Sequence, residues 1–134
     1  MIQALLDTDT FIELLRGNTA IASRAKAARE RTLGVSMITV FELHVGVQKS
    51  RSPEENERFL RDVLAPFVVL PFDDDAAQHA AKVRAILERK GRGIGPFDTL
   101  IAGHALSLNA QVITANTREF GRVPGLRSAD WRAE

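Results

Sequence analysis

The chain has 134 residues, of which 45% are hydrophobic and 26% are charged, and its formal net charge is +1. These values predict one folded domain over residues 1–134 and exclude a disordered chain. The absence of cysteine excludes disulfide scaffolds, thiolate zinc sites and cysteine nucleophiles, and it suits a reducing compartment. Because no secretory leader or membrane-spanning segment is recognisable, we expect a cytoplasmic protein.

The first half of the chain alternates short apolar runs with helical patterns. Residues 2–6 (IQALL) are typical of a buried strand, and Asp7 and Asp9 suit the first turn of a helix that Gly17 ends. The segment 38–49 is almost entirely apolar, which indicates a buried helix. In chain order, we predict a strand over 2–6, helices over 7–17 and 20–31, a strand over 33–37 and a helix over 38–49.

The second half continues this alternation. Pro53 starts a helix with an apolar stripe, Asp73 caps the next helix, and Pro96 starts the one after it. Strands are predicted over 67–72 and 111–114, and a loop containing VPGL completes the fold. Strands that alternate with helices predict an α/β fold, in which a parallel sheet is covered by helices on both faces.

Three carboxylates stand in unusually apolar surroundings. Glu42 lies within MITVFELHVGV, Asp98 lies within IGPFDTLIAGHAL, and Asp7 ends the first predicted strand. An unpaired carboxylate is costly to bury, so a chain keeps one where cations or hydrogen-bond donors meet it. Each residue also has an ordinary explanation. Asp7 can cap the following helix, Asp98 can interact with a helix dipole, and Glu42 can pair with a buried arginine.

The positions of these acids suggest that they meet. Asp7 and Glu42 both follow predicted strands, and Asp98 opens a helix. Sites in open α/β sheets form at the carboxyl ends of strands. Carboxylates gathered there repel one another unless a divalent cation neutralises them, and oxygen ligands favour Mg²⁺ or Mn²⁺. Glu119, after the last predicted strand, either completes this ring of acids or is a solvated loop residue.

Four stretches of the sequence carry a family resemblance. The segments LLDTDTFIELLRG, SMITVFELHVGVQKS, GPFDTLIAGHA and TANTREFGRVPGL resemble the signature stretches of PIN-domain ribonucleases, and more narrowly those of the VapC toxins of type II toxin–antitoxin pairs. The resemblance spans nearly the whole chain. It implies a three-layer α/β/α fold with a mostly parallel sheet. It also implies endonucleolytic cleavage of RNA, with tRNA as one candidate, at a site that holds Mg²⁺ or Mn²⁺.

The resemblance also assigns roles to residues. By motif position it implies that the catalytic, metal-binding acids are Asp7, Glu42, Asp98 and Glu119. Relatives often carry aspartate where Glu119 stands, so direct metal contact is least certain there. Asp9 replaces an Asn or Ser of relatives, and its charge either strengthens a metal site or caps the helix. Thr39 and Asn116 are expected to orient the ligands or a water molecule.

The resemblance further implies partners, namely a VapB-type antitoxin that blocks the site with a basic side chain, and a second copy of the toxin. The apolar stripe of the helix beginning at Pro53 bears on this expectation. The stripe consists of Phe59, Leu60, Val63 and Leu64. It either packs wholly inside the domain or, together with the first helix, forms a groove for the antitoxin or a self-dimer surface.

RNA binding requires cations around an acidic pocket, and a net charge of +1 means that local clusters must supply them. The candidates lie just before Asp98 and beside Glu119, and they are Arg89, Lys90, Arg92, Arg118 and Arg122. The alternative for each is a solvated basic surface. The histidines show no spacing that indicates catalysis, and we expect a structural role for His104.

Two other functions fit parts of the sequence. LLDTDT after a strand imitates the opening of haloacid-dehalogenase-like phosphohydrolases, with Asp7 as nucleophile and Asp9 as acid and base. That chemistry also needs a paired acidic motif and a later lysine. FDDD at 72–75 can imitate the acidic pair, but Lys82 and Lys90 are poorly placed. The other alternative is a catalytically silent partner-binding module, which the presence of all four acids argues against.

Overall fold

The computed structural model describes residues 1–132, which fold around a five-stranded sheet with the strand order β3-β2-β1-β4-β5. The four strand pairings in this sheet are all parallel, as expected for alternating strands and helices. The strands are short, and they are β1 (Ala4–Leu6), β2 (Leu33–Ser36), β3 (Val68–Leu70), β4 (Gln111–Ile113) and β5 (Ser128–Ala129).

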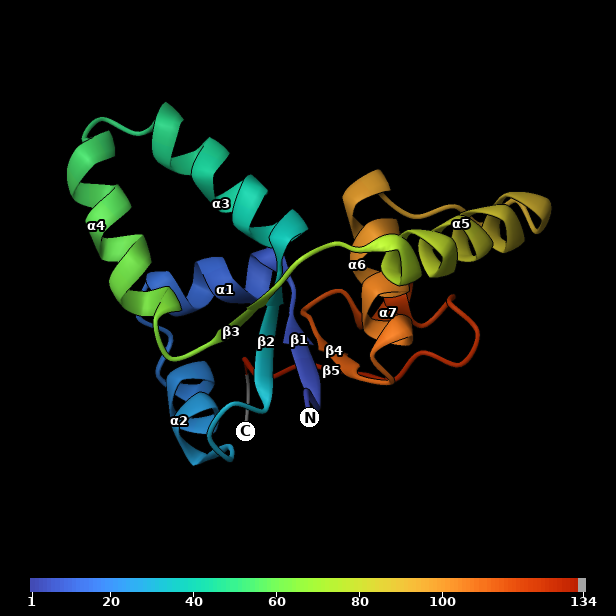
Figure 1. Ribbon diagram of the computed structural model, residues 1–134, viewed down its shortest axis with the longest axis horizontal. Helices are drawn as coiled ribbons and strands as arrows, with labels where there is room; N and C mark the ends of the chain where they lie inside the picture. The colour runs from blue at the N-terminus through green and yellow to red at the C-terminus, as the bar shows by residue number, and fades with distance from the viewer. Residues whose placement is uncertain (133–134) are drawn as a thin grey trace.

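Helices cover both faces of the sheet, so the predicted three-layer α/β/α architecture is confirmed. In Figure 1 the helices from the first half of the chain lie on one side of the sheet and those from the second half on the other. The helices are α1 (Thr8–Leu15), α2 (Thr19–Ala27), α3 (Met37–Lys49), α4 (Pro53–Leu64), α5 (Asp74–Arg89), α6 (Pro96–Ser107) and α7 (Thr117–Phe120). Within residues 1–132, none of them is long and apolar enough to cross a membrane.

Side chains that alternate along the central strands build two separate cores. Leu6 and Ile113 pack with residues of α1, α3 and α4, whereas Leu5 and Val112 pack with residues of α5, α6 and α7. Because successive side chains of a strand point to opposite faces, each central strand supplies both cores. The sheet is therefore buried on both faces, and its carboxyl edge is left as the open place for polar side chains.

The helices that lead to this edge begin where the sequence predicts. Asp73 caps α5 by accepting a hydrogen bond from the Ala76 amide at 2.9 Å. Pro96 occupies the first turn of α6. Gly103 fixes the depth of α6, because a Cβ on it would lie 2.3 Å from the Cα of Ala80. Only glycine allows α6 to pack this closely on α5, which sets where the start of α6 meets the sheet edge.

Two short elements near the end of the chain differ from the prediction. The segment 117–120 forms α7 and the segment 128–129 forms β5, where only loops were expected. Both elements are shorter than hydrophobic periodicity can reveal. They matter for the site because α7 carries Glu119 and β5 pairs with β4 at the edge where the acids gather.

Helix α3 was also predicted wrongly, because it is not buried on all sides. Met37, Phe41 and Val45 are 45%, 52% and 37% exposed, whereas Thr39 and Leu43 on the opposite face are buried. In α4, Leu60 is buried but Phe59 is 49% exposed, so the apolar stripe does not pack wholly inside. Apolar side chains thus lie on the surface along both helices.

Candidate active site

Asp7 stands at the point where β1 ends and α1 begins. The backbone hydrogen bonds between β1 and β4 extend one residue beyond β1, because the Asp7 amide donates to the Ile113 carbonyl at 3.0 Å. The Asp7 side chain is buried and its Oδ1 accepts a hydrogen bond from the Thr10 amide at 2.9 Å. Asp7 therefore does cap α1, as the structural explanation proposed, and it also lies at the open edge of the sheet.

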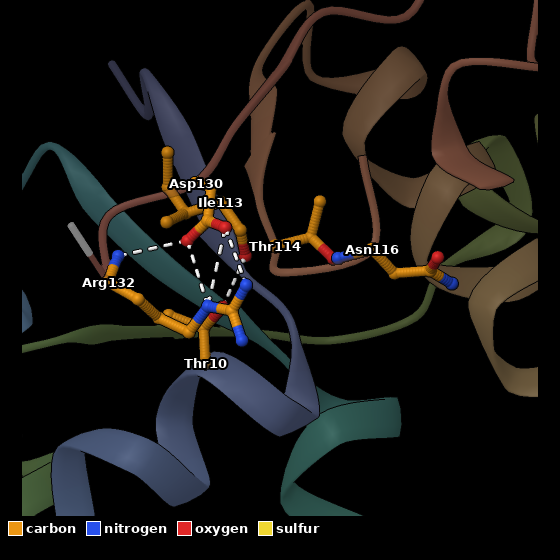
Figure 2. Close-up of polar contacts among 6 residues, drawn as sticks. All are labelled: Thr10, Ile113, Thr114, Asn116, Asp130 and Arg132. Carbon is orange, nitrogen blue, oxygen red and sulfur yellow. Dashed lines mark hydrogen bonds and ion pairs between the residues drawn. The ribbon is translucent and has the colours of Figure 1, made fainter. Parts of the chain in front are cut away.

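Burial and hydrogen bonding act in opposite directions on the pKa of Asp7. Burial raises the pKa of the carboxyl above its ordinary value, while hydrogen bonds from Thr114 and Thr10 act in the opposite direction. Figure 2 shows how the end of β4 is joined to α1 and to the turn that follows the strand: the Thr10 hydroxyl donates to the Ile113 carbonyl at 3.0 Å, and the Thr114 hydroxyl accepts from the Asn116 amide at 2.9 Å. Hydrogen bonds therefore connect the elements on either side of Asp7.

Glu42 projects from α3 toward the same place. The helix is capped by Ser36, whose Oγ accepts from the Ile38 amide at 3.1 Å. The Thr8 hydroxyl donates to Glu42 Oε1 at 2.5 Å and also contacts the Thr39 hydroxyl at 3.2 Å. Glu42 is thus held by a hydroxyl of α1 and not by the buried arginine considered as an alternative.

Asp98, in the first turn of α6, shows that the acids converge. Its pKa is raised to about 6, first by burial and then by repulsion from other carboxylates. The repelling groups are Asp7, Asp9, Glu119 and Glu42. Four acids that lie far from Asp98 in the chain, two at the start of α1, one on α3 and one on α7, therefore act on it electrostatically. The structure brings together all four acids predicted as catalytic, and Asp9 with them.

Glu119 has a polar partner of its own. The Asn116 side-chain amide donates a short hydrogen bond to Glu119 Oε2. Asn116 precedes α7, and its backbone amide is bound to Thr114 at the end of β4. Asn116 therefore fixes the direction of one carboxylate, as proposed from the sequence, and whether Glu119 contacts a metal stays a prediction.

The four predicted acids have no basic partner among the ion pairs of residues 1–132. Within the same residues, no three acidic or histidine side chains already stand as a ready-made metal cage. The donor set nevertheless fits a hard divalent cation, because it offers carboxylate oxygens whose mutual repulsion a cation would relieve. Side-chain rotation at the half-buried Glu42 and Asp98 would be needed to close such a cage.

The basic residues predicted to bind RNA are spread around the site. Arg89 ends α5, Lys90 and Arg92 follow it, and all three are exposed. Arg118 is exposed on α7. Arg122 Nη1 donates to the Gly93 carbonyl at 3.2 Å and its buried Nε has no partner among the described residues, so this side chain ties α7 to the loop before α6. RNA contacts by these five residues stay a prediction.

Two threonines of the site were missed in the sequence. Thr8 holds Glu42, and Thr114 hydrogen-bonds both Asp7 and the Asn116 amide. A hydroxyl residue beside an acid carries little signal by itself. The available signal was position, because Thr8 follows the first strand and Thr114 ends the last predicted strand, at the edge where the acids were expected.

Comparison with known proteins agrees with this geometry. The family model described as PIN domain matches residues 4–126. The chain belongs to the PIN-domain family. Within it, the chain is 39% identical to the tRNA(fMet)-specific endonuclease VapC of Shigella flexneri over 131 residues, covering 98% of this chain and 99% of the relative. It is 36% identical to Ribonuclease VapC2 of Haemophilus influenzae over 132 residues, with 98% and 99% covered.

Comparison with solved structures identifies the same group of PIN domains. The DNA-bound VapBC of Salmonella typhimurium matches with a TM-score of 0.93 and 39% identity, covering 98% of this chain and 99% of that chain. VapBC-1 of nontypeable Haemophilus influenzae matches with a TM-score of 0.90 and 36% identity, with 99% and 100% covered. The chain is therefore a PIN domain of the VapC type over nearly its full length.

Proposed function

We propose that this chain is an endoribonuclease toxin that depends on Mg²⁺ or Mn²⁺ and forms a VapBC-type pair with an antitoxin. The observation that carries the proposal is the convergence of four other carboxylates on Asp98, whose pKa is raised to about 6. The relatives are named ribonucleases, and one is named a tRNA(fMet)-specific endonuclease. We infer RNA as the substrate class, with tRNA as its first candidate. A chain without cysteine suits the reducing cytoplasm, where we expect it to act.

The reaction is hydrolysis of a phosphodiester bond, in which water attacks phosphorus and a P–O bond to the adjoining nucleotide breaks. Asp7 and Asp98 are the firmest candidate ligands for the cation, with Glu42 as a further ligand or as the group that orients the water. When bound, Mg²⁺ or Mn²⁺ supplies Lewis acidity to the water and the scissile phosphate. Thr8 holds one oxygen of Glu42 and leaves the other available, and Asn116 does the same for Glu119.

A groove beside the acids supports the antitoxin as partner. It has a volume of about 450 Å³ and lies between α1, α3 and α4. Its lining includes the apolar side chains Ile12, Leu15, Leu43, Val47, Phe59 and Leu60, and it also includes Glu42. An apolar segment lying in this groove would bring a basic side chain to the acids, where it would compete with the metal.

An exposed patch supports a second copy of the chain as a further partner. Met37, Phe41 and Val45 lie along one face of α3, and the ring of Phe97 on α6 stands 5.8 Å from that of Phe41. Exposed aromatic and aliphatic side chains gathered in this way are typical of protein interfaces. Because Phe41 and Phe97 directly precede Glu42 and Asp98, a dimer formed here would set two acidic sites near each other.

The test combines RNA cleavage with co-expression. Purified protein should cleave RNA with Mg²⁺ or Mn²⁺ and stop when excess chelator is added, and sequencing of the RNA ends should identify the target. Co-expressed with the small reading frame adjacent to its gene, it should co-purify with that product and lose activity. Undiminished cleavage in chelator would refute the metal mechanism. A neighbour that neither binds nor inhibits would refute the toxin–antitoxin assignment and leave the nuclease assignment standing.

The other two functions are less well supported. Asp73, the first acid of FDDD, is engaged in capping α5, and Lys82 and Lys90 are exposed on or just after that helix. The residues that an aspartyl phosphohydrolase requires are therefore not gathered around Asp7. A silent partner-binding module would bind neither Mg²⁺ nor Mn²⁺ in calorimetry, so the same protein preparation distinguishes it from the nuclease.

A further inference from the structure

One buried polar pair at the sheet edge takes no part in the acid cluster. His104, on α6, is 2% exposed, and its Nδ1 lies 2.8 Å from the Oγ of Ser36, which is fully buried at the end of β2. The rings of His104 and Phe72 pack nearly perpendicular to each other, with their centroids 5.4 Å apart. Burial lowers the pKa of His104, against a weaker opposite effect of Asp73. The ring is therefore neutral near neutral pH and can share one hydrogen bond with Ser36.

Ser36 is also the residue that starts α3. Its Oγ accepts from the Ile38 amide at 3.1 Å, so one hydroxyl serves both the cap of α3 and the contact with α6. Glu42 lies six residues after Ser36 on α3, and Asp98 lies six residues before His104 on α6, which is less than two helical turns in each case. The pair thus stands between the two helices that carry half of the predicted catalytic acids.

Few other contacts set the position of α6 relative to α3. Among the hydrogen bonds described for residues 1–132, His104 to Ser36 is the one that joins the segment 33–49 to α6. The other contacts are apolar: the half-exposed rings of Phe41 and Phe97 meet, and Ile38 of α3 packs against the core cluster that contains Ile101 of α6. A hydrogen bond between buried groups has a narrow range of length and angle, which an apolar contact lacks.

We propose that His104 is a positioning residue for the reaction: its hydrogen bond to Ser36 fixes α6 against the start of α3 and so sets the separation of Asp98 and Glu42. The expected effect on catalysis rests on the proposed nuclease function, whereas the expected effect on helix placement does not. The bond is buried and lies outside the site, so it acts through helix placement and does not touch substrate or metal.

The test replaces each partner of the bond. His104→Phe keeps a buried ring without nitrogen, and His104→Asn keeps a hydrogen-bonding group near the position of Nδ1. Ser36→Ala removes the bond from the other side and the cap of α3 with it, so only an effect that His104→Phe shares is assigned to the bond. Ile21→Val, a truncation of a buried residue on α2, is the control that lowers stability without touching α3 or α6. Each variant is assayed below its melting temperature for kcat and KM.

A distance measurement supplies a readout that needs no activity. Because the chain has no cysteine, spin labels can be placed on introduced cysteines at Gln48, exposed on α3, and at Ser107, the last residue of α6. In the parent protein the distance distribution between the labels should be narrow. In His104→Phe and Ser36→Ala it should shift or broaden, and His104→Asn should restore it.

The kinetic expectation follows from the distance. His104→Phe and Ser36→Ala should lower kcat by about tenfold or more with KM for RNA little changed, since small misplacements of catalytic groups are costly. His104→Asn should recover most of the rate, and Ile21→Val should leave it unchanged. An unchanged distance distribution in both disruptive variants overturns the proposal. So does a fall in kcat that Ile21→Val reproduces. If the parent protein cleaves no RNA, the proposed function fails, and the distance measurement still decides the positioning.

Discussion

Asp98 and Asp130 lie at the same edge of the sheet and carry the same side chain, but their electrostatic surroundings differ. Asp98 faces four other acids, and its pKa is raised to about 6. Asp130, directly after β5, accepts hydrogen bonds from Arg132, which hold its pKa below the usual range (Figure 2). The second carboxylate has a cationic partner within the protein, whereas the first has none among the ion pairs of residues 1–132 and, on the proposed function, takes a divalent cation as its partner. Asp130 is therefore a built-in reference for every experiment on Asp98.

The largest expected difference is in cleavage. On the proposed function, Asp98→Asn removes a charge that would hold the cation, and it should lower the rate of RNA cleavage by on the order of 100- to 1000-fold, as loss of one strong electrostatic contact to a reacting group does. Asp130→Asn makes the same chemical change outside the site and should leave the rate unchanged. Single-turnover cleavage with saturating Mn²⁺ measures both. Equal rates in the parent and Asp98→Asn would remove Asp98 from the site.

Metal binding should separate the two aspartates next. A ligand at 100 times its Kd stabilises the folded state by about 2.7 kcal/mol. We therefore expect Mn²⁺ to raise the melting temperature of the parent and of Asp130→Asn, and chelator to reverse the effect. Asp98→Asn should show little response at the same Mn²⁺ concentration. A response of Asp98→Asn equal to that of the parent would mean that the cation binds elsewhere.

A smaller effect is expected from the hydroxyl that holds Glu42. Thr8→Val keeps the shape of the side chain but removes the 2.5 Å hydrogen bond to Glu42. Loss of a group that orients a metal ligand usually costs about 10- to 100-fold in metal affinity or activity. The matched control is Thr32→Val, since the hydroxyl of Thr32 donates to the Arg29 carbonyl far from the site. If both variants lose the same activity, Thr8 has no specific role.

The smallest difference concerns stability and pH, and it has opposite signs at the two aspartates. The raised pKa of Asp98 means that the folded state keeps a proton that the unfolded chain has released, so its contribution to stability falls between about pH 4 and pH 6. Without metal, Asp98→Asn should be more stable than the parent at pH 7 by about 1 kcal/mol, after allowance for solvent screening of a half-exposed group. This gain should vanish below about pH 4.

The lowered pKa of Asp130 acts the other way. Its hydrogen bonds stabilise the fold above the ordinary carboxyl pKa, and this contribution is lost as the pH falls. Asp130→Asn should therefore be slightly less stable than the parent at pH 7. Chemical denaturation of the two variants and the parent across pH 4 to 8 checks both signs. Two shifts in the same direction would contradict the comparison between the aspartates.

The acids of the site were predictable because they break the local pattern. Glu42 and Asp98 interrupt apolar helices, and Asp7 ends an apolar strand, so each carries a cost that only a tertiary partner explains. The convergence of the four acids then follows from parallel strands that end at one edge. Thr8 and Thr114 were not predictable in the same way, because threonine is common in strands, at helix starts and on the surface.

The exposed face of α3 shows a different limit. Phe41 and Leu43 are equally apolar in sequence, yet Phe41 is 52% exposed and Leu43 is 5% exposed. Hydropathy cannot distinguish a side chain that packs in the domain core from one that packs against a second protein, because burial of apolar surface favours both arrangements. The short elements α7 and β5 were missed because they hold too few residues to show a period.

The strand order has a consequence for synthesis on the ribosome. The central strand β1 is made first, but its neighbour β4 begins at Gln111, so the middle of the sheet stays unpaired on one side until most of the chain has emerged. Asp98 and Glu119 arrive equally late. A nascent chain that carries Asp7 and Glu42 therefore has only half of the predicted catalytic acids, and translation interrupted before Asp98 releases fragments without the other half. The topology thus delays the assembly of the four predicted acids until β4 and the segment after it have been made.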